Sequence, residues 1–200
     1  VKAELERMGG YEIAYISHAD FASVPKAVMF FTKKAFLLAT AKYVFLNDNF
    51  MPMANLNFSK DAVVTQLWHA EGAFKKFGLS APLTDEVRER EKKCSEKLTY
   101  VVCSSKNVAP VYAEAFGVDK SRILPLGTPR IDMLLCGCDI RKIRDDFDMK
   151  HPECKGKKLI LYAPTFRDDP ETDKNIVNNI DIDLFRRELG DDYALLVKLH

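Results

Sequence analysis

Two histidines in this sequence are placed where an imidazole can act as a catalytic base. His69 follows Trp68 after a short apolar run, and His200 follows the apolar run at the end of the chain. Each therefore lies at the carboxyl end of a predicted strand, the edge at which an open α/β sheet binds its ligands. A neutral imidazole there can take a proton from a hydroxyl near neutral pH. We interpret both as candidate catalytic residues, with a structural role as the alternative, and assign no role to His18 or His151.

Other strand ends carry hydroxyl and guanidinium groups, which hold phosphate oxygens well. Ser104 and Arg130 each follow one predicted strand, and Thr165 and Arg167 follow another. Ser104 is equally well explained as a helix cap, because serine is preferred there. Arg130 has the alternative of a solvated residue in the first turn of a helix, where a cation is unfavourable. The candidate substrate-binding residues are Trp68, Lys75, Ser104, Arg130, Thr165 and Arg167.

The elements that position these residues alternate between strands and helices. Around Trp68 the hydrophobic period predicts a strand at 63–67 and then a turn into a basic helix that carries Lys75. Thr84 predicts a helix N-cap, and Gly117 a helix end. Short joins between alternating elements favour parallel sheets built from βαβ units. Further strands are predicted at 11–16, 42–46, 100–103, 122–126, 159–162 and 193–199, and helices at 1–8, from 24 onward, 84–97, 108–116 and 183–189.

Composition describes an ordinary globular protein. Of the 200 residues 47% are hydrophobic and 30% charged, and the net charge of +1 gives no reason to expect nucleic-acid binding. This length provides one domain and part of a second. The chain begins as if inside a helix, has no initiator methionine or signal peptide, and stops on a strand. We therefore expect it to be part of a longer protein.

The cysteines predict neither a disulfide framework nor a zinc site. There are five, an odd number, and none forms a CxxC pair. Reduced thiols of a cytoplasmic protein are the expectation. No Walker loop, GxGxxG, HExxH or GxSxG pattern is present. We expect no metal ion and no cofactor.

The apolar run 24–46 raises the question of a membrane. Its four lysines leave no uncharged span near the ~18–20 residues that cross a bilayer. A helix packed on the sheet is the favoured interpretation, and a helix lying on a membrane surface is the alternative. The polar and aromatic loop at 47–60 follows the strand that ends this run, which makes it a candidate ligand contact.

Several of these motifs, in this order, resemble the CDP-glycerol glycerophosphotransferase family, which contains the teichoic-acid glycerol-phosphate and ribitol-phosphate polymerases and primases of bacteria. The similarity extends from about residue 11 onward. The matching motifs are Gln-Leu-Trp-His at 66–69, Phe-Lys-Lys-Phe-Gly at 74–78, Gly-Thr-Pro-Arg-Ile-Asp at 127–132, Leu-Tyr-Ala-Pro-Thr-Phe-Arg at 161–167 and Lys-Leu-His at 198–200.

The resemblance implies a GT-B-like α/β fold with two Rossmann-like domains facing a cleft. Residues 1–140 would form the acceptor-side domain, 141–157 a polar linker, and 158–200 the start of a truncated nucleotide-donor domain, so the chain alone is expected to be inactive. The implied reaction transfers a polyol phosphate from CDP-glycerol or CDP-ribitol to a lipid-linked or polymer acceptor, and releases CMP. Peripheral attachment to the inner face of the cell membrane follows from such acceptors.

The resemblance also assigns roles to individual residues. His69 matches the base that activates the acceptor hydroxyl, and His200 matches a histidine associated with the donor phosphates. Arg130 matches the arginine of a Gly-x-Pro-Arg motif, while Thr165 and Arg167 match the loop near the donor site. The sequence departs from the family at 70–72, where many members have Gly-Thr-Pro, and at 166, where tryptophan is frequent. A nucleotide-sugar glycosyltransferase and an inactive nucleotide-binding scaffold are the alternatives.

Overall fold

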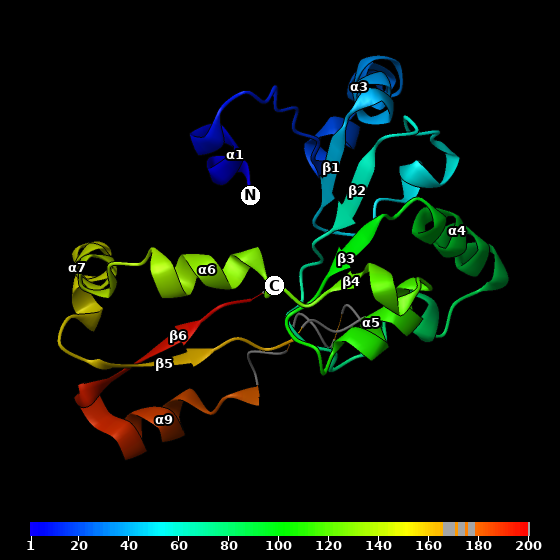
Figure 1. Cartoon of the computed structure of the whole chain (residues 1–200). Helices are drawn as coiled ribbons and strands as arrows, with labels where there is room; N and C mark the ends of the chain where they lie inside the picture. The colour runs from blue at the N-terminus through cyan, green and yellow to red at the C-terminus, as the bar shows by residue number, and fades with distance from the viewer. Residues whose placement is uncertain (166–170, 172–174, 176–178, 200) are drawn as a thin grey trace. The chain divides into compact units, whose positions relative to one another are not determined.

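The computed structural model describes residues 1–165, 171, 175 and 179–199. The chain divides into two compact units, Val1–Gly137 and Cys138–His200. The first unit contains a four-stranded sheet and the second a two-stranded sheet (Figure 1). All strand pairs in both sheets are parallel, and helices connect the strands. The predicted α/β class is therefore confirmed.

The first sheet has its strands in the order of the sequence, β1-β2-β3-β4. Gln66, the last residue of β2, pairs with Leu46 on β1 and with Val101 on β3. Because the strands are parallel, all their carboxyl ends lie along one edge of the sheet. The strands are β1 Tyr43–Leu46, β2 Val63–Gln66, β3 Tyr100–Val102 and β4 Ile123–Leu124.

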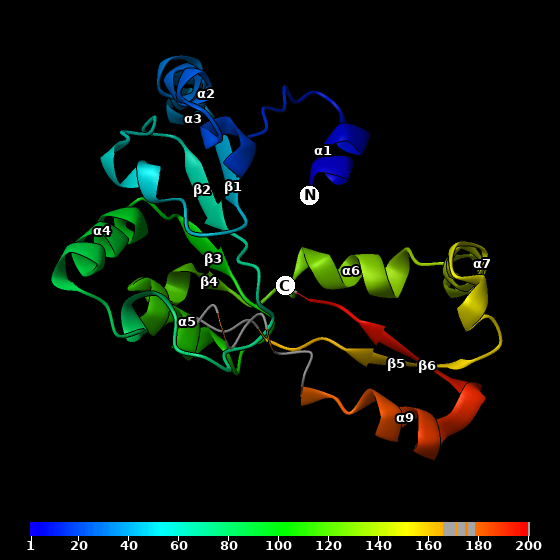
Figure 2. The same ribbon diagram turned by 180° about the vertical axis from the view of Figure 1, so that it is seen from behind.

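Two helices complete the core of the first unit. Helix α4, Asp85–Glu96, begins at Thr84, whose hydroxyl accepts the backbone N–H of Val87, as the predicted cap requires. Helix α5, Ala109–Phe116, contacts β4 in both views (Figures 1 and 2) and ends at Gly117 in the left-handed conformation. The buried core joins side chains of the strands and helices, among them Leu38, Val44, Met53, Val64, Cys94, Val101, Tyr112, Phe116 and Ile123.

The predicted helix from Val24 is present in three pieces. Helix α2, Val24–Met29, continues through a π-helical turn at Phe30–Lys34 into α3, Ala35–Thr40. Phe30 is fully buried, whereas Phe31 and Phe36 are about two-thirds exposed, so only one face of this helix packs on the core. Within the described residues, no helix combines the length and hydropathy of a membrane span.

The predicted strand at 11–16 is wrong. Helix α1, Lys2–Met8, is followed by a segment without regular secondary structure, which pairs with no strand in the described part of the chain. Tyr11, Ile13 and Tyr15 are all exposed. Alternation of apolar residues stabilises a strand only when one face is buried against a core, and the face formed by these three residues is not.

The second unit is a βαβ arrangement. Strand β5, Lys158–Tyr162, pairs in parallel with β6, Tyr193–Val197, from Lys158 opposite Tyr193 to Tyr162 opposite Val197. Helix α9, Ile182–Leu189, precedes β6. The interval 141–157, expected to be a linker, contains most of helix α7, Ile140–Lys150. The assignment of domains and linker stays a prediction.

Short 3₁₀ turns join the larger elements. They lie at His18–Phe21, Met51–Asn55, Gly78–Ser80, Lys120–Arg122, Pro152–Cys154 and Gly190–Asp192.

Candidate functional site

A small pocket opens at the carboxyl edge of the first sheet. Its volume is about 50 Å³, which accommodates a few water-sized groups but no nucleotide. The wall combines a carboxylate, an imidazole, an amide, a hydroxyl and a guanidinium, so it is suited to a polar group of a substrate. The lining residues are Asn47, Leu67, Trp68, His69, Glu71, Thr128, Pro129 and Arg130.

Trp68 gives this pocket its shape through an unusual backbone conformation. Its φ of 59° is the one positive φ outside glycine in the described chain. The left-handed region costs an L-residue ~1–2 kcal/mol. The indole stacks on Phe77 at 5.2 Å between ring centroids and meets Phe116 edge-on at 5.2 Å. Such ring pairs contribute ~0.5–1.5 kcal/mol each, so this packing offsets the strain.

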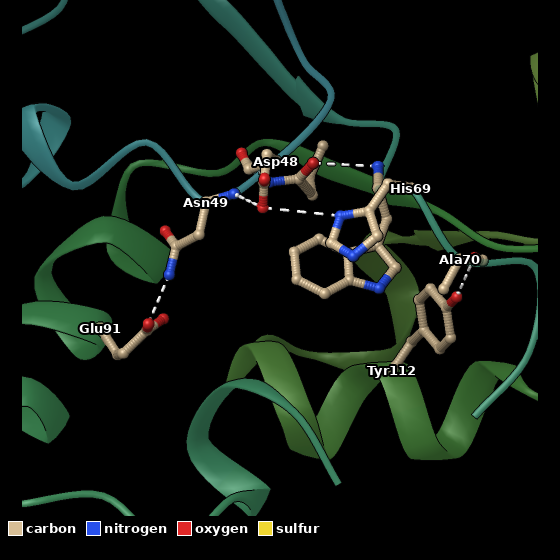
Figure 3. A network of polar contacts seen from close by, with 8 residues as sticks. Asp48, Asn49, His69, Ala70, Glu91 and Tyr112 are labelled. Atoms are coloured by element: carbon tan, nitrogen blue, oxygen red, sulfur yellow. Dashed lines mark hydrogen bonds and ion pairs between the residues drawn. The ribbon is translucent and has the colours of Figure 1, made fainter. Parts of the chain in front are cut away.

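His69 is thereby turned toward the end of β1. Its imidazole lies against the Trp68 indole, with ring centroids 4.2 Å apart. Its Nδ1 is 3.5 Å from Asp48 Oδ1, and its side chain is 44% exposed (Figure 3). A carboxylate facing Nδ1 favours the tautomer with the proton on that nitrogen, which leaves Nε2 free to accept one.

Asp48 and the next residue, Asn49, are held by two elements, β2 and α4. Its carboxylate accepts the backbone N–H of Asn49 at 2.7 Å, and its carbonyl accepts the Gln66 side-chain amide at 3.1 Å. The Asn49 amide donates to Glu91 of α4 (Figure 3). The residues after β1 are thus fixed both to β2 and to α4.

The loop after His69 is anchored from below by Tyr112 on α5. Tyr112 is fully buried, and its hydroxyl donates to the Ala70 carbonyl at 2.7 Å (Figure 3). Burial raises the pKa of Tyr112 to about 12. A hydroxyl that stays protonated at neutral pH keeps the O–H that it donates to this carbonyl.

The predicted basic helix after His69 is wrong. Residues 70–77 form an irregular loop that ends in the 3₁₀ turn Gly78–Ser80, and Lys75 is exposed. Carbonyls at the start of the loop face the Tyr112 hydroxyl, and the Phe77 ring packs among those of Trp68, Tyr112 and Phe116. These tertiary contacts override the local helix propensity.

The far wall of the pocket is the first turn of α6, Pro129–Cys136. Thr128 is at its N-cap position, but its side chain makes no capping bond. Instead Thr128 Oγ1 is buried with no hydrogen-bond partner among the described residues. A buried hydroxyl without a partner is unfavourable by ~1–3 kcal/mol, and a ligand group in the pocket would satisfy it.

The structure brings together three of the predicted site residues: Trp68, His69 and Arg130 line one pocket. Lys75 and Ser104 are not among its lining residues. Thr165 is exposed after β5 in the second unit, and Arg167 and His200 lie outside the described residues. The catalytic and binding roles of all these residues stay predictions.

Sequence reasoning did not single out Asp48, Gln66, Tyr112 or Thr128. Asp48 falls in the loop that was expected to contact ligand. Gln66 carried a usable signal, because a glutamine inside an apolar strand has to find partners for its amide. Tyr112 is separated by 42 residues from the carbonyl it binds, so no local pattern indicates it.

Comparison with known proteins finds similar sequences among teichoic acid polymerases and primases. The chain is 35% identical over 167 residues to a teichoic acid poly(ribitol-phosphate) polymerase of Bacillus spizizenii, covering 83% of this chain and 27% of that protein. It is 35% identical over 170 residues to a ribitol-phosphate primase of the same species, covering 82% and 43%. A glycerol-phosphate primase of Bacillus subtilis is 29% identical, covering 84% and 43%. The chain thus spans less than half the length of these relatives.

Solved structures of the wall teichoic acid polymerase TagF have the same fold. A histidine variant of TagF superposes with a TM-score of 0.67 at 26% identity, covering 80% of this chain and 40% of TagF. Another histidine variant, soaked with CDPG, superposes with a TM-score of 0.64 at 24% identity, covering 80% and 39%. The sequence profile of one family, CDP-Glycerol:Poly(glycerophosphate) glycerophosphotransferase, matches residues 2–200. This chain therefore belongs to the CDP-glycerol:poly(glycerophosphate) glycerophosphotransferase family.

Proposed function

We propose that the complete protein transfers glycerol phosphate or ribitol phosphate from a CDP-activated donor to a hydroxyl of a lipid-linked or polymer acceptor in the synthesis of teichoic acid or a related polymer. The family and the names of the relatives support this reaction class. The observation that carries the proposal is the pocket itself. It gathers in one lining His69, Arg130 and Thr128, whose buried hydroxyl has no partner in the described part of the chain.

In the proposed mechanism, His69 Nε2 takes the proton of the acceptor hydroxyl. The acceptor oxygen forms a bond to the phosphorus that carries the polyol, the bond from this phosphorus to the CMP oxygen breaks, and CMP leaves. Bonding to the transferred group is loose in such transition states, so the protein acts mainly by positioning groups and neutralising charge. We assign charge neutralisation to Arg130, Arg167 and His200, and substrate contacts to Trp68, Lys75, Ser104 and Thr165.

Release of CMP from CDP-glycerol or CDP-ribitol in the presence of a lipid-linked acceptor tests this function. We expect a new phosphodiester in the product, and we expect His69→Ala to lower turnover by ~10²–10⁴-fold while donor binding is retained. His151→Ala is the matched control, because His151 is similarly exposed and its Nδ1 lies 3.4 Å from Glu153. Turnover retained by His69→Ala would contradict the assignment of the base. Release of a nucleoside diphosphate would indicate a glycosyltransferase, and donor binding without turnover a scaffold.

We further propose that the α2–α3 helix rests on the anionic inner face of the cell membrane. Its outward side exposes Val24, Val28, Phe31 and Phe36. The segment 24–46 contains four lysines and no acidic residue. Exposed apolar side chains beside lysines are typical of helices that lie in the interface of an anionic bilayer.

Vesicle sedimentation tests the membrane contact. We expect the complete protein to sediment with vesicles that contain phosphatidylglycerol more than with neutral ones, and the double variant Phe31→Ser/Phe36→Ser to lose most of this binding. Phe74→Ser is the control, since Phe74 is fully exposed but belongs to the loop 70–77 and not to this helix. Equal loss in the control and the double variant would contradict the assignment to α2–α3.

A further inference from the structure

Gln66 has a buried amide that connects the two residues on either side of His69's imidazole. The side chain is 2% exposed at the end of β2. Its Nε2 donates to the carbonyl of Asp48, and its Oε1 accepts the backbone N–H of Trp68 at 2.9 Å. Burial of an amide is unfavourable unless it is hydrogen-bonded, and here both ends of the amide have a partner.

The bond to Trp68 acts where the backbone is strained. Trp68 has a φ of 59°, and this turn sets the direction in which the next residue, His69, leaves the strand. A residue in the left-handed region persists only when its surroundings fix it. The Gln66 oxygen fixes the N–H of this residue, while the aromatic packing fixes its ring.

The bond to Asp48 acts on the other side of the imidazole. The separation of 3.5 Å between His69 Nδ1 and Asp48 Oδ1 is longer than a good hydrogen bond, so this contact is too weak to hold either residue in place. Asp48 is exposed, with 59% of its side chain accessible. Its position therefore depends on the bonds of its neighbours, and the Gln66 amide ties its backbone to β2.

We infer that Gln66 is a positioning residue for His69: one buried amide holds the backbone of Asp48, whose carboxylate faces Nδ1, and the turn that presents the ring, and so favours the tautomer in which Nε2 can accept a proton. This inference rests on the proposed function for its catalytic consequence, because Gln66 itself touches no reacting group. The placement of the ring is a property of the protein and can be measured without turnover.

The test compares Gln66→Met with wild type in the complete protein. Methionine is close to glutamine in length but offers no amide. Val64→Ala is the matched control, because Val64 lies on the same strand at 1% exposure and takes no part in the network. Long-range ¹H–¹⁵N spectra of histidine-labelled protein report the tautomer of each imidazole, and steady-state kinetics with a CDP-polyol separate kcat from KM.

We expect Gln66→Met to change the His69 signals from one dominant tautomer to a mixture, and to leave those of His151 unchanged. We expect kcat to fall by ~10²-fold with little change in the KM for the donor, as for a misplaced catalytic group. Val64→Ala should change neither the His69 signals nor kcat. Because Asp48 and Gln66 act through one imidazole, their effects should not be independent: the double variant Asp48→Ala/Gln66→Met should lose less kcat than the two single losses multiplied together.

An unchanged His69 spectrum in a folded Gln66→Met protein would overturn the inference. If that variant does not fold, Gln66→Glu replaces it, since it retains the acceptor for Trp68 and lacks the donor for Asp48. The His69 spectrum and kcat of Gln66→Glu then test the inference in the same way. A changed His69 spectrum with unchanged kcat would support the positioning and contradict His69 as the base. A wild type that turns over no CDP-polyol would contradict the proposed function alone, because the spectra still test Gln66.

Discussion

Replacement of Gly78 by alanine should destabilise the first unit much more than the same replacement at Gly127. Both glycines have a positive φ, +53° at Gly78 and +86° at Gly127, so both substitutions carry the left-handed penalty of ~1–2 kcal/mol. At Gly127 the new methyl group meets nothing within 4 Å. At Gly78 it would lie 2.2 Å from the carbonyl oxygen of Ala115, inside α5.

The additional loss at Gly78 follows from that contact. A backbone carbonyl in a helix cannot rotate away, so the 3₁₀ turn at Gly78–Ser80 has to move off α5. Overpacking of this kind costs ~1–3 kcal/mol, which brings the total for Gly78→Ala to ~2–5 kcal/mol. This is a large part of the ~5–15 kcal/mol that stabilises a typical domain.

Urea unfolding followed by fluorescence measures the difference directly. Trp68 is the single tryptophan of this chain, and it stacks on Phe77, the residue before Gly78. We expect the free energy of unfolding to fall ~1–3 kcal/mol further in Gly78→Ala than in Gly127→Ala. We also expect a change in the native emission, because a shifted turn loosens the ring stack. Equal losses in the two variants would refute the packing argument.

Three further results are expected from buried polar groups. Tyr112→Phe should lower the free energy of unfolding by ~1 kcal/mol at pH 7, since the bond to Ala70 is lost. Because burial raises the pKa of Tyr112 to about 12, wild type should lose stability as the pH rises from ~10 toward 12, and the variant should lose less. Urea titrations across this pH range measure the difference. Thr128→Val should leave thermal stability unchanged or higher, because Oγ1 has no partner among the described residues, yet lower the turnover of CDP-polyol if that hydroxyl contacts substrate. Cys94 should resist iodoacetamide at pH 7.5 in the native protein and react after unfolding, because burial raises the pKa of its thiol to about 11; rapid native alkylation found by peptide mass spectrometry would contradict this.

The strands of the sheets were predictable from sequence because each is a short apolar run between breakers. The central strand β2, which ends at Gln66, is largely buried along its length, whereas the edge strand β1, which ends at Leu46, alternates between exposed and buried residues. The segment 11–16 also alternates, but alternation states only which side chains share a face. A partner strand and a core for that face depend on the tertiary structure. For the exposed apolar face of 11–16, neither is found in the described chain.

The site was predictable only in part. His69 and Arg130, which line the pocket, were singled out because each follows a predicted strand, and the carboxyl edge of a parallel sheet is where ligands bind. Gln66 and Tyr112 were missed because their roles are defined by partners that lie 18 and 42 residues away in the sequence. The sequence can show that a polar side chain in a buried strand needs hydrogen-bond partners, but the partners themselves depend on which backbone groups the fold brings beside it.

The conformation of one turn explains why Arg130 shares a pocket with His69 although β3 lies between their strands. The N–H of Gly127 donates to the carbonyl of Cys103 at 3.1 Å, which extends the β3–β4 pairing beyond both strands. With its φ of +86°, Gly127 then turns the chain, and Thr128 to Arg130 reach the residues that follow β2. Ser104, directly after β3, is left outside the lining. Strand ends therefore identify the edge of the sheet at which a site forms, but the turns at that edge decide which strand ends contribute to it.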